Sequence, residues 1–135
     1  MRWMALPVAL GVLAVPTAAS AKTIGPEQFG LHVGTLGGGT TPLVSVGSVR
    51  LWDSGVRWDQ IETRKGVYNC AALDRAVDAA ERAGATEILY VLGSTPKWAA
   101  SKFSSVDLYG PGSASLPKKS SYYLKYAKAL AARYK

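Results

Sequence analysis

Three short and nearly continuous apolar segments constrain most strongly how this chain of 135 residues can fold. They cover residues 29–34, 48–53 and 87–93, with the sequences FGLHVG, SVRLWD and EILYVLG. Continuous rather than alternating hydrophobicity is typical of parallel strands that are covered on both faces. We therefore predict that the three segments are strands of one parallel sheet.

A strong amphipathic helix pattern lies between the second and third predicted strands. Asn69 can cap the N-terminus of this helix, and Gly84 can end it. Its apolar residues recur at the helical spacing i, i+3, i+4 and i+7: Leu73, Ala76, Val77 and Ala80. A strand, a helix and a second strand in this order predict a βαβ unit.

A second amphipathic helix is predicted over residues 120–135, SSYYLKYAKALAARYK, where two serines can begin it. Its expected apolar face consists of Tyr123, Ala127, Leu130, Ala131 and Tyr134.

The connection between the first two strands, residues 35–47, has room for about one turn of helix. Its glycines match neither the dinucleotide-binding nor the P-loop spacing, and no helix pattern follows them. The sequence therefore favours a loop that is flexible or that approaches another segment closely, rather than a phosphate-binding loop.

This order of elements begins both a doubly wound sheet and a (β/α)8 barrel, and both architectures bind ligands at the carboxyl ends of the strands. Three parallel strands cannot close a barrel. We therefore expect the first and third strands to be edges, and one face of the sheet to be open to water.

The N-terminus has the pattern of a secretory signal peptide. A positive charge in MRWM precedes an apolar run of about a dozen residues, and small residues follow at Ala19 and Ala21. We predict a signal peptide over residues 1–21, cleavage after Ala21, and a secreted mature chain 22–135. The apolar run is shorter than the roughly 20 residues that span a bilayer, so no stable membrane anchor is expected.

Composition excludes several classes of protein. A chain with 48% hydrophobic and 19% charged residues is typical of a globular domain and not of a disordered one. The net charge is +7, but the cations are scattered, with no run longer than Lys118 and Lys119, so no nucleic-acid partner is predicted. Cys70 is the only cysteine, which excludes an internal disulfide framework, and we expect it to be a half-buried residue rather than a nucleophile.

Arg50 is the most unusual residue of the second predicted strand. Alternation places Arg50 and Trp52 on the same face. A guanidinium that points into a sheet interior needs a carboxylate partner, because burying it alone costs many kcal/mol. Arg50 therefore either closes a structural ion pair or holds a catalytic carboxylate ionised and oriented.

Trp98 and His32 are two further candidates for a binding site. Trp98 follows the third strand, where an indole can offer a platform to a sugar face or can pack the loop against the core. His32 lies near the end of the first strand, as a ligand contact or as a satisfied core residue. The chain has one histidine and one cysteine, which are too few for a metal site of these ligands. The sequence therefore predicts neither a metal site nor a cofactor.

Two segments together resemble a known family. SVRLWDSGVRWDQIETRKGVYNCAALDRAVDAAERAG and EILYVLGSTPKWAAS resemble the amino-terminal part of secreted retaining glycoside hydrolases of clan A. The closest likeness is to bacterial relatives of glycoside hydrolase family 39, which includes xylosidases and iduronidases. The elements in common are R-x-W-D, W-x-x-I-E, K-G-x-Y and T-P-x-W-A, in this order, within residues 29–135.

The resemblance implies an incomplete (β/α)8 TIM barrel, of which this chain carries the first three β-strands and their associated helices. It also implies an oligo- or polysaccharide substrate. Arg50 would neighbour the catalytic nucleophile, and Trp98 and His32 would lie near the sugar subsite. The W-x-x-I-E element, which ends at Glu62, would be mainly structural.

The two catalytic glutamates of such enzymes are missing from this chain. The family carries them at the ends of the fourth and seventh strands, roughly 5 Å apart in a retaining enzyme. We therefore expect the front of a longer enzyme of about 250 or more residues, inactive by itself. Asp53 and Glu62 are the nearest substitutes, but they flank a structural turn.

Two other functions remain open from the sequence. The first is a non-catalytic carbohydrate-binding protein that keeps the aromatic platform without the acids. The second is a doubly wound α/β protein that binds a small phosphorylated ligand at its strand ends.

Overall fold

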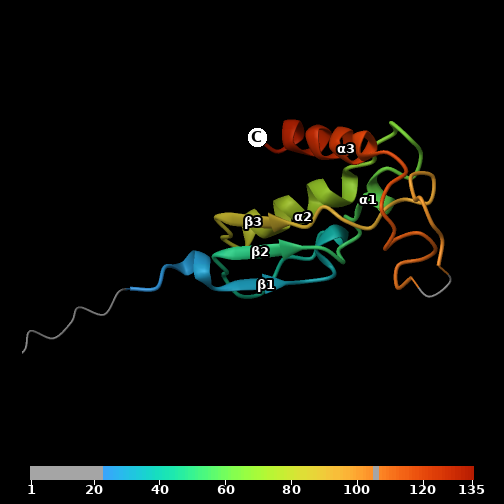
Figure 1. Ribbon diagram of the computed structural model, residues 1–135. Helices are drawn as coiled ribbons and strands as arrows, with labels where there is room; N and C mark the ends of the chain where they lie inside the picture. Colours follow the sequence, from blue (N-terminus) through green and yellow to red (C-terminus); the bar gives the residue numbers. More distant parts are fainter. Residues whose placement is uncertain (1–22, 105–106) are drawn as a thin grey trace, which may run out of the picture.

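The computed structural model describes residues 23–104 and 107–135 (Figure 1). The predicted signal peptide over residues 1–21 and the cleavage site after Ala21 lie outside this part. The strands are β1 (Gly30–His32), β2 (Ser48–Leu51) and β3 (Glu87–Tyr90). The helices are α1 (Trp58–Ile61), α2 (Ala71–Arg82) and α3 (Ser120–Arg133), together with two 3₁₀ turns, η1 (Pro26–Gln28) and η2 (Leu36–Gly38).

The three strands form one parallel sheet in the order β1-β2-β3. This confirms the predicted α/β class and the parallel βαβ unit. In the part of the chain that the structure describes, β1 and β3 are edge strands, as expected for three strands that cannot close. Each strand is shorter than its predicted segment because pairing ends before the last residues of the apolar run.

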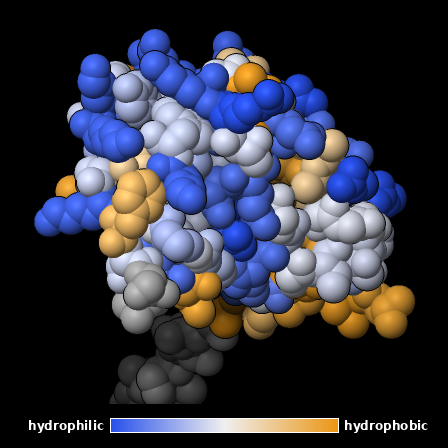
Figure 2. Space-filling view, turned by 90° about the vertical axis from the view of Figure 1, so that its right-hand side faces the viewer, coloured by the Kyte–Doolittle hydropathy of each residue, from blue (hydrophilic) through white to orange (hydrophobic). Residues whose placement is uncertain are grey.

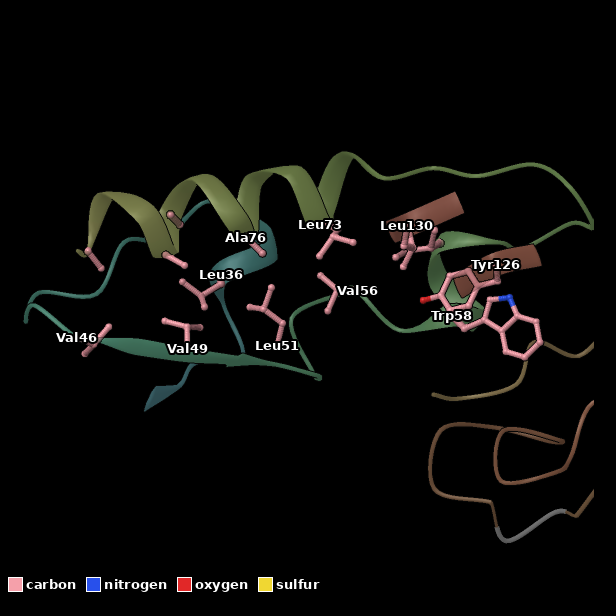
Figure 3. Close-up of a cluster of buried hydrophobic side chains, with 14 of the residues drawn as sticks. Leu36, Val46, Val49, Leu51, Val56, Trp58, Leu73, Ala76, Tyr126 and Leu130 are labelled. Atoms are coloured by element: carbon pink, nitrogen blue, oxygen red, sulfur yellow. The ribbon is translucent and has the colours of Figure 1, made fainter. Parts of the chain in front are cut away.

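Helix α2 covers one face of the sheet, and the hydrophobic core lies between them (Figure 3). Val49 and Leu51 of β2 point toward the helix, and Leu73 and Ala76 of α2 point toward the sheet. Leu36 of η2 fills the space between them and is fully buried. The predicted apolar face of α2 is therefore confirmed in its main positions.

The N-terminus of α2 differs from the prediction by one residue, and its C-terminus agrees with the prediction. Cys70 is the N-cap residue, whereas the Asn69 Oδ1 atom accepts a hydrogen bond from the Ala71 amide at 3.2 Å. Gly84, with a φ of 87°, ends the helix in the left-handed conformation that glycine adopts without strain.

The connection between β1 and β2 contains the predicted single helical turn, η2, and it approaches its neighbour closely. A Cβ atom placed on Gly37 would lie 1.6 Å from the Ser54 carbonyl oxygen. This position therefore requires glycine for a packing reason. The nearby guanidinium of Arg75 donates to the Gly37 carbonyl at 2.8 Å and fixes the turn on α2.

Helix α3 buries only part of its predicted apolar face. Tyr126 and Leu130 are the buried residues, whereas Tyr123 and Tyr134 are exposed. Tyr126 lies stacked on the indole of Trp58, with ring centroids 5.1 Å apart, and its hydroxyl meets that of Tyr90. The prediction is therefore confirmed for Leu130, whereas it missed the burial of Tyr126 and was wrong for Tyr123 and Tyr134.

No helix in the described ranges has the length and apolar character that crossing a membrane requires.

Candidate functional site

The face of the sheet opposite α2 carries a row of exposed side chains. His32, Arg50 and Leu89 are register partners on β1, β2 and β3, so their side chains lie side by side. All three are exposed. The expectation that Arg50 is buried was therefore wrong, because only the other face of the sheet is covered by a helix. Within residues 23–104 and 107–135, no carboxylate forms an ion pair with Arg50.

His32 has a fixed ring orientation at the end of this row. Its Nδ1 lies 3.0 Å from the carbonyl oxygen of Arg50. Because a carbonyl only accepts hydrogen bonds, Nδ1 is the donor in this contact. Nε2 lies 3.8 Å from Asp53 Oδ2, and both side chains are accessible. The two strand ends thus present an imidazole and a carboxylate beside the Arg50 cation.

Trp52, the predicted site residue directly after β2, joins the strand end to a distant loop. Its indole N–H donates to the Tyr109 hydroxyl at 2.8 Å, and the two rings meet edge to face with centroids 5.4 Å apart. The ring of Trp52 also packs directly against Gly93, where a Cβ atom would come within 2.8 Å. Trp52 therefore fixes the loop after β3 above the end of β2.

Tyr109 is a residue of this site that the sequence did not reveal. The guanidinium carbon of Arg57 lies 4.3 Å from the centre of its ring, in a cation–π contact. The same guanidinium donates to Asp59 at 3.1 Å. The repeat of Arg-Trp-Asp at residues 57–59 was a visible signal for this cluster, but nothing in the spacing pointed to an aromatic partner about fifty residues further along.

Backbone hydrogen bonds dock this cluster onto the end of β3. The amides of Trp58 and Asp59 donate to the carbonyls of Gly93 and Ser94, each at 3.0 Å. Ser94 has a φ of 65°, an uncommon conformation for a residue with a side chain. The loops after β2 and β3 are therefore held together at the carboxyl end of the sheet.

Trp98 lies among packing residues. Its indole N–H donates to the Glu62 carbonyl at 2.8 Å, and its ring contacts Trp58 and Tyr122, with centroids 6.2 and 5.3 Å apart. The structure does not bring Trp98 into contact with His32, Arg50 or Trp52. Its contacts correspond to the alternative in which this tryptophan packs the loop against the core.

Glu62 is almost completely buried, and both of its carboxylate oxygens are engaged. The indole of Trp58 donates to Oε2 at 2.6 Å, and the amide of Gly66 donates to Oε1 at 2.7 Å. These bonds hold the turn after α1. The geometry is that of a structural carboxylate.

Cys70 is half-buried at the start of α2. Burial raises the pKa of its thiol, so the reactive thiolate is a smaller fraction at neutral pH than for an ordinary cysteine. This environment does not favour a nucleophile.

Two cavities lie beside these elements. A small one of about 240 Å³ lies between the loops after β2 and β3, and its lining includes Asp59, Lys97 and Tyr109. A larger one of about 640 Å³ lies beside β3, between α2 and α3, with a mainly apolar lining. The end of the molecule formed by the loops is largely hydrophilic in its middle and hydrophobic at its lower margin (Figure 2).

Metal ligands do not cluster in the described ranges, where no three histidine, cysteine, aspartate or glutamate side chains come together in a possible metal site.

Comparisons with protein-family models, with curated proteins and with solved structures gave no match to this chain.

Proposed function

We propose that this chain is the sugar-binding front part of a secreted retaining glycoside hydrolase. In this proposal β1, β2 and β3 are the first three strands of a (β/α)8 barrel, and the uncovered face of the sheet lines the barrel interior. The sequence resemblance to clan A glycoside hydrolases motivates the proposal. Its main structural support is the exposed row of His32 and Arg50 with Asp53 and Trp52 at the carboxyl ends of the strands.

The chemistry of this group suits a hydroxylated ligand. The Arg50 guanidinium donates hydrogen bonds, the Asp53 carboxylate accepts them, and the His32 imidazole lies beside both. A sugar ring carries vicinal hydroxyls that donate and accept at the same time. Trp52 adds apolar area, and a carbon–hydrogen face of a sugar can pack against it.

Catalysis is proposed to depend on carboxylates outside the described residues. A retaining mechanism needs an acid/base and a nucleophile about 5 Å apart. Glu62 is buried and fully engaged, and Asp59 is held by Arg57. If the reading frame continues beyond Lys135, we expect one strand that ends in Asn-Glu and a later one that ends in Glu.

Binding of neutral oligosaccharides by the full chain tests the proposal. Isothermal titration with xylotetraose and cellotetraose is expected to show binding of at least one of them, without release of reducing ends. Arg50→Met should weaken this binding about tenfold, the effect of one lost charged hydrogen bond. Arg64→Met removes an exposed arginine elsewhere and is the matched control. Equal affinities of the wild type and Arg50→Met, or no binding at all, would contradict the proposal.

Non-catalytic carbohydrate binding is the second candidate function. It is favoured by the engagement of Glu62 and Asp59 in structural contacts. Sugar binding by this chain, combined with a reading frame that encodes no further strand ending in glutamate, would support it over the hydrolase.

A further inference from the structure

The charged residues of this chain are distributed unevenly. Residues 108–135 contain six lysines and arginines and no aspartate or glutamate, whereas residues 23–107 contain eight basic and nine acidic residues. The cations occur throughout the chain, but in its last part no carboxylate balances them. The excess positive charge of the described residues therefore belongs to α3 and to the segment that leads into it.

Helix α3 presents these cations on the side that faces away from the core. Its buried face packs on the core, and Lys125 and Lys128, spaced i and i+3, share the exposed side. Lys118 and Lys119 are exposed directly before the helix begins. Among the described residues, none of these four lysines has an ion-pair partner. Their charges therefore act together on whatever approaches the helix.

Two neighbouring cations differ in their contribution to this charge. The Arg133 guanidinium donates to both carboxylate oxygens of Asp74, at 2.8 and 2.7 Å, so this pair adds no net charge. Lys65, on the turn after α1, is exposed, and its ammonium lies 4.8 Å from the centre of the Tyr122 ring in the first turn of α3. Lys65 therefore adds a fifth cation beside the start of the helix.

The lysines stand on a ridge and not in a groove. Helix α3 lies at the upper margin of the molecule, away from the sheet (Figure 1). Hollows of about 640 and 380 Å³ lie along its two flanks, and neither Lys125 nor Lys128 lines them. Linear polyanions such as single-stranded nucleic acids are typically bound in charged grooves that follow the polymer. A ridge about 21 Å long instead meets a flat surface along its whole length.

Exposed leucines accompany the lysines. Leu116, two residues before Lys118, is 80% exposed, and Leu124, one turn before Lys128, is 53% exposed. Lysine and leucine side chains together on one exposed surface are typical of helices that lie on an anionic bilayer. There the ammonium groups meet the lipid phosphates, and the apolar groups enter the layer beneath them. This combination favours a lipid surface over an acidic polymer in water.

We propose that the outer surface of α3 docks reversibly onto an anionic phospholipid surface. This α3 surface consists of Lys118, Lys119, Leu124, Lys125 and Lys128. The helix lies in the plane of the lipid headgroups and does not cross the bilayer. The uncovered face of the sheet lies on the side opposite to α2 and stays open to a ligand. The inference goes beyond the proposed function and does not depend on it.

Co-sedimentation of the full chain with lipid vesicles tests the α3 surface. Vesicles of equal parts phosphatidylcholine and phosphatidylglycerol provide an anionic surface, and vesicles of phosphatidylcholine alone provide an uncharged one. We expect at least about tenfold tighter binding to the anionic vesicles, because several lysines contribute to the attraction. Raising the ionic strength from about 0.1 M to about 1 M shortens the screening length from about 10 Å to about 3 Å and should remove this preference.

Charge-removing variants locate the binding surface. Lys125→Gln combined with Lys128→Gln should weaken binding to the anionic vesicles about twentyfold, which is about fivefold per lysine. The matched control combines Arg82→Gln with Lys97→Gln, which removes the same charge at exposed positions that line other hollows. Leu124→Ser should also weaken binding, because it removes the apolar group that enters the headgroup layer. Urea unfolding of each variant checks that the fold is kept.

Three results would overturn the proposal. The first is equal affinity of the wild type for both kinds of vesicle, and the second is equal affinity of the two double variants for the anionic vesicles. The third is the absence of vesicle binding. If the chain then bound polygalacturonate, a linear polyanion, through Lys125 and Lys128, the α3 surface would be assigned to acidic polymers instead. None of these results bears on the binding of neutral oligosaccharides.

Discussion

Replacing Tyr90 by phenylalanine is expected to destabilise the fold more than the same replacement of Tyr126, although Tyr126 is the more deeply buried residue. The Tyr90 hydroxyl donates to the carbonyl oxygen of Val56 and also meets the Tyr126 hydroxyl. A tyrosine hydroxyl has one proton and accepts through its lone pairs. Both contacts are satisfied only if Tyr126 donates to Tyr90 and Tyr90 donates to Val56.

The relay makes the two replacements unequal. Tyr126→Phe removes one hydrogen bond and leaves no donor unpaired, so it should cost about 1 kcal/mol. Tyr90→Phe removes two bonds and leaves the buried Val56 carbonyl and the buried Tyr126 hydroxyl without their partners, which should cost about 2–4 kcal/mol. The double replacement leaves only the carbonyl of Val56 unpaired. It should therefore be less destabilising than Tyr90→Phe alone.

Urea unfolding of the four proteins measures these differences. With a slope of about 2 kcal/mol per molar urea, the midpoint should fall by about 0.5 M for Tyr126→Phe and by about 1–2 M for Tyr90→Phe. The double variant should unfold at a higher urea concentration than Tyr90→Phe. An equal or larger cost for Tyr126→Phe, or additive costs in the double variant, would refute the inferred direction of the relay.

Three further predictions concern pH and packing. The hydrogen bonds from Arg133 lower the pKa of Asp74. The stability that this carboxylate contributes is therefore present above its ordinary pKa of 3.8 and is lost as the pH falls below it. Acid unfolding of Asp74→Asn, followed by circular dichroism, should lack this component. Burial raises the pKa of Tyr126. The stability of the fold should therefore fall as the pH rises above about 10, because the tyrosine of the unfolded chain loses its proton first. In urea unfolding at pH 9 to 11, Tyr126→Phe should show a smaller loss of stability with pH. Gly37→Ala should cost more than about 3 kcal/mol, whereas Gly38→Ala, with open space around the added methyl, should unfold at nearly the wild-type temperature; similar melting temperatures of the two variants would contradict this packing argument.

The local patterns predicted the secondary structure because they follow from backbone geometry. Residues 87–93 form a continuous apolar run, and the helix that ends at Gly84 has a clear 3.6-residue period. Such signals depend on neighbours in the sequence. They could therefore be read without knowing which segments meet.

The burial of Tyr126 in α3 could not be predicted in this way. Apolar spacing favoured Tyr123 and Tyr134, but Tyr126 is the residue that finds both an aromatic partner, Trp58, and a hydroxyl partner, Tyr90. A tyrosine can be placed on either the buried or the exposed face of a helix, because its ring is apolar and its hydroxyl is polar. The choice was made by contacts more than thirty residues away in the sequence.

The candidate site divides in the same manner. The sequence by itself determined that His32, Arg50 and Trp52 lie at the ends of parallel strands, because alternation and strand order fix their face and edge. Only the tertiary structure decided that Arg50 is exposed, that Trp98 packs against Trp58, and that Tyr109 joins Trp52 to a second cavity. The physical reason is that burial and contact depend on which face of the sheet α2 covers and on how the long loop after β3 folds back. The spacing of residues along one segment encodes neither of these two arrangements.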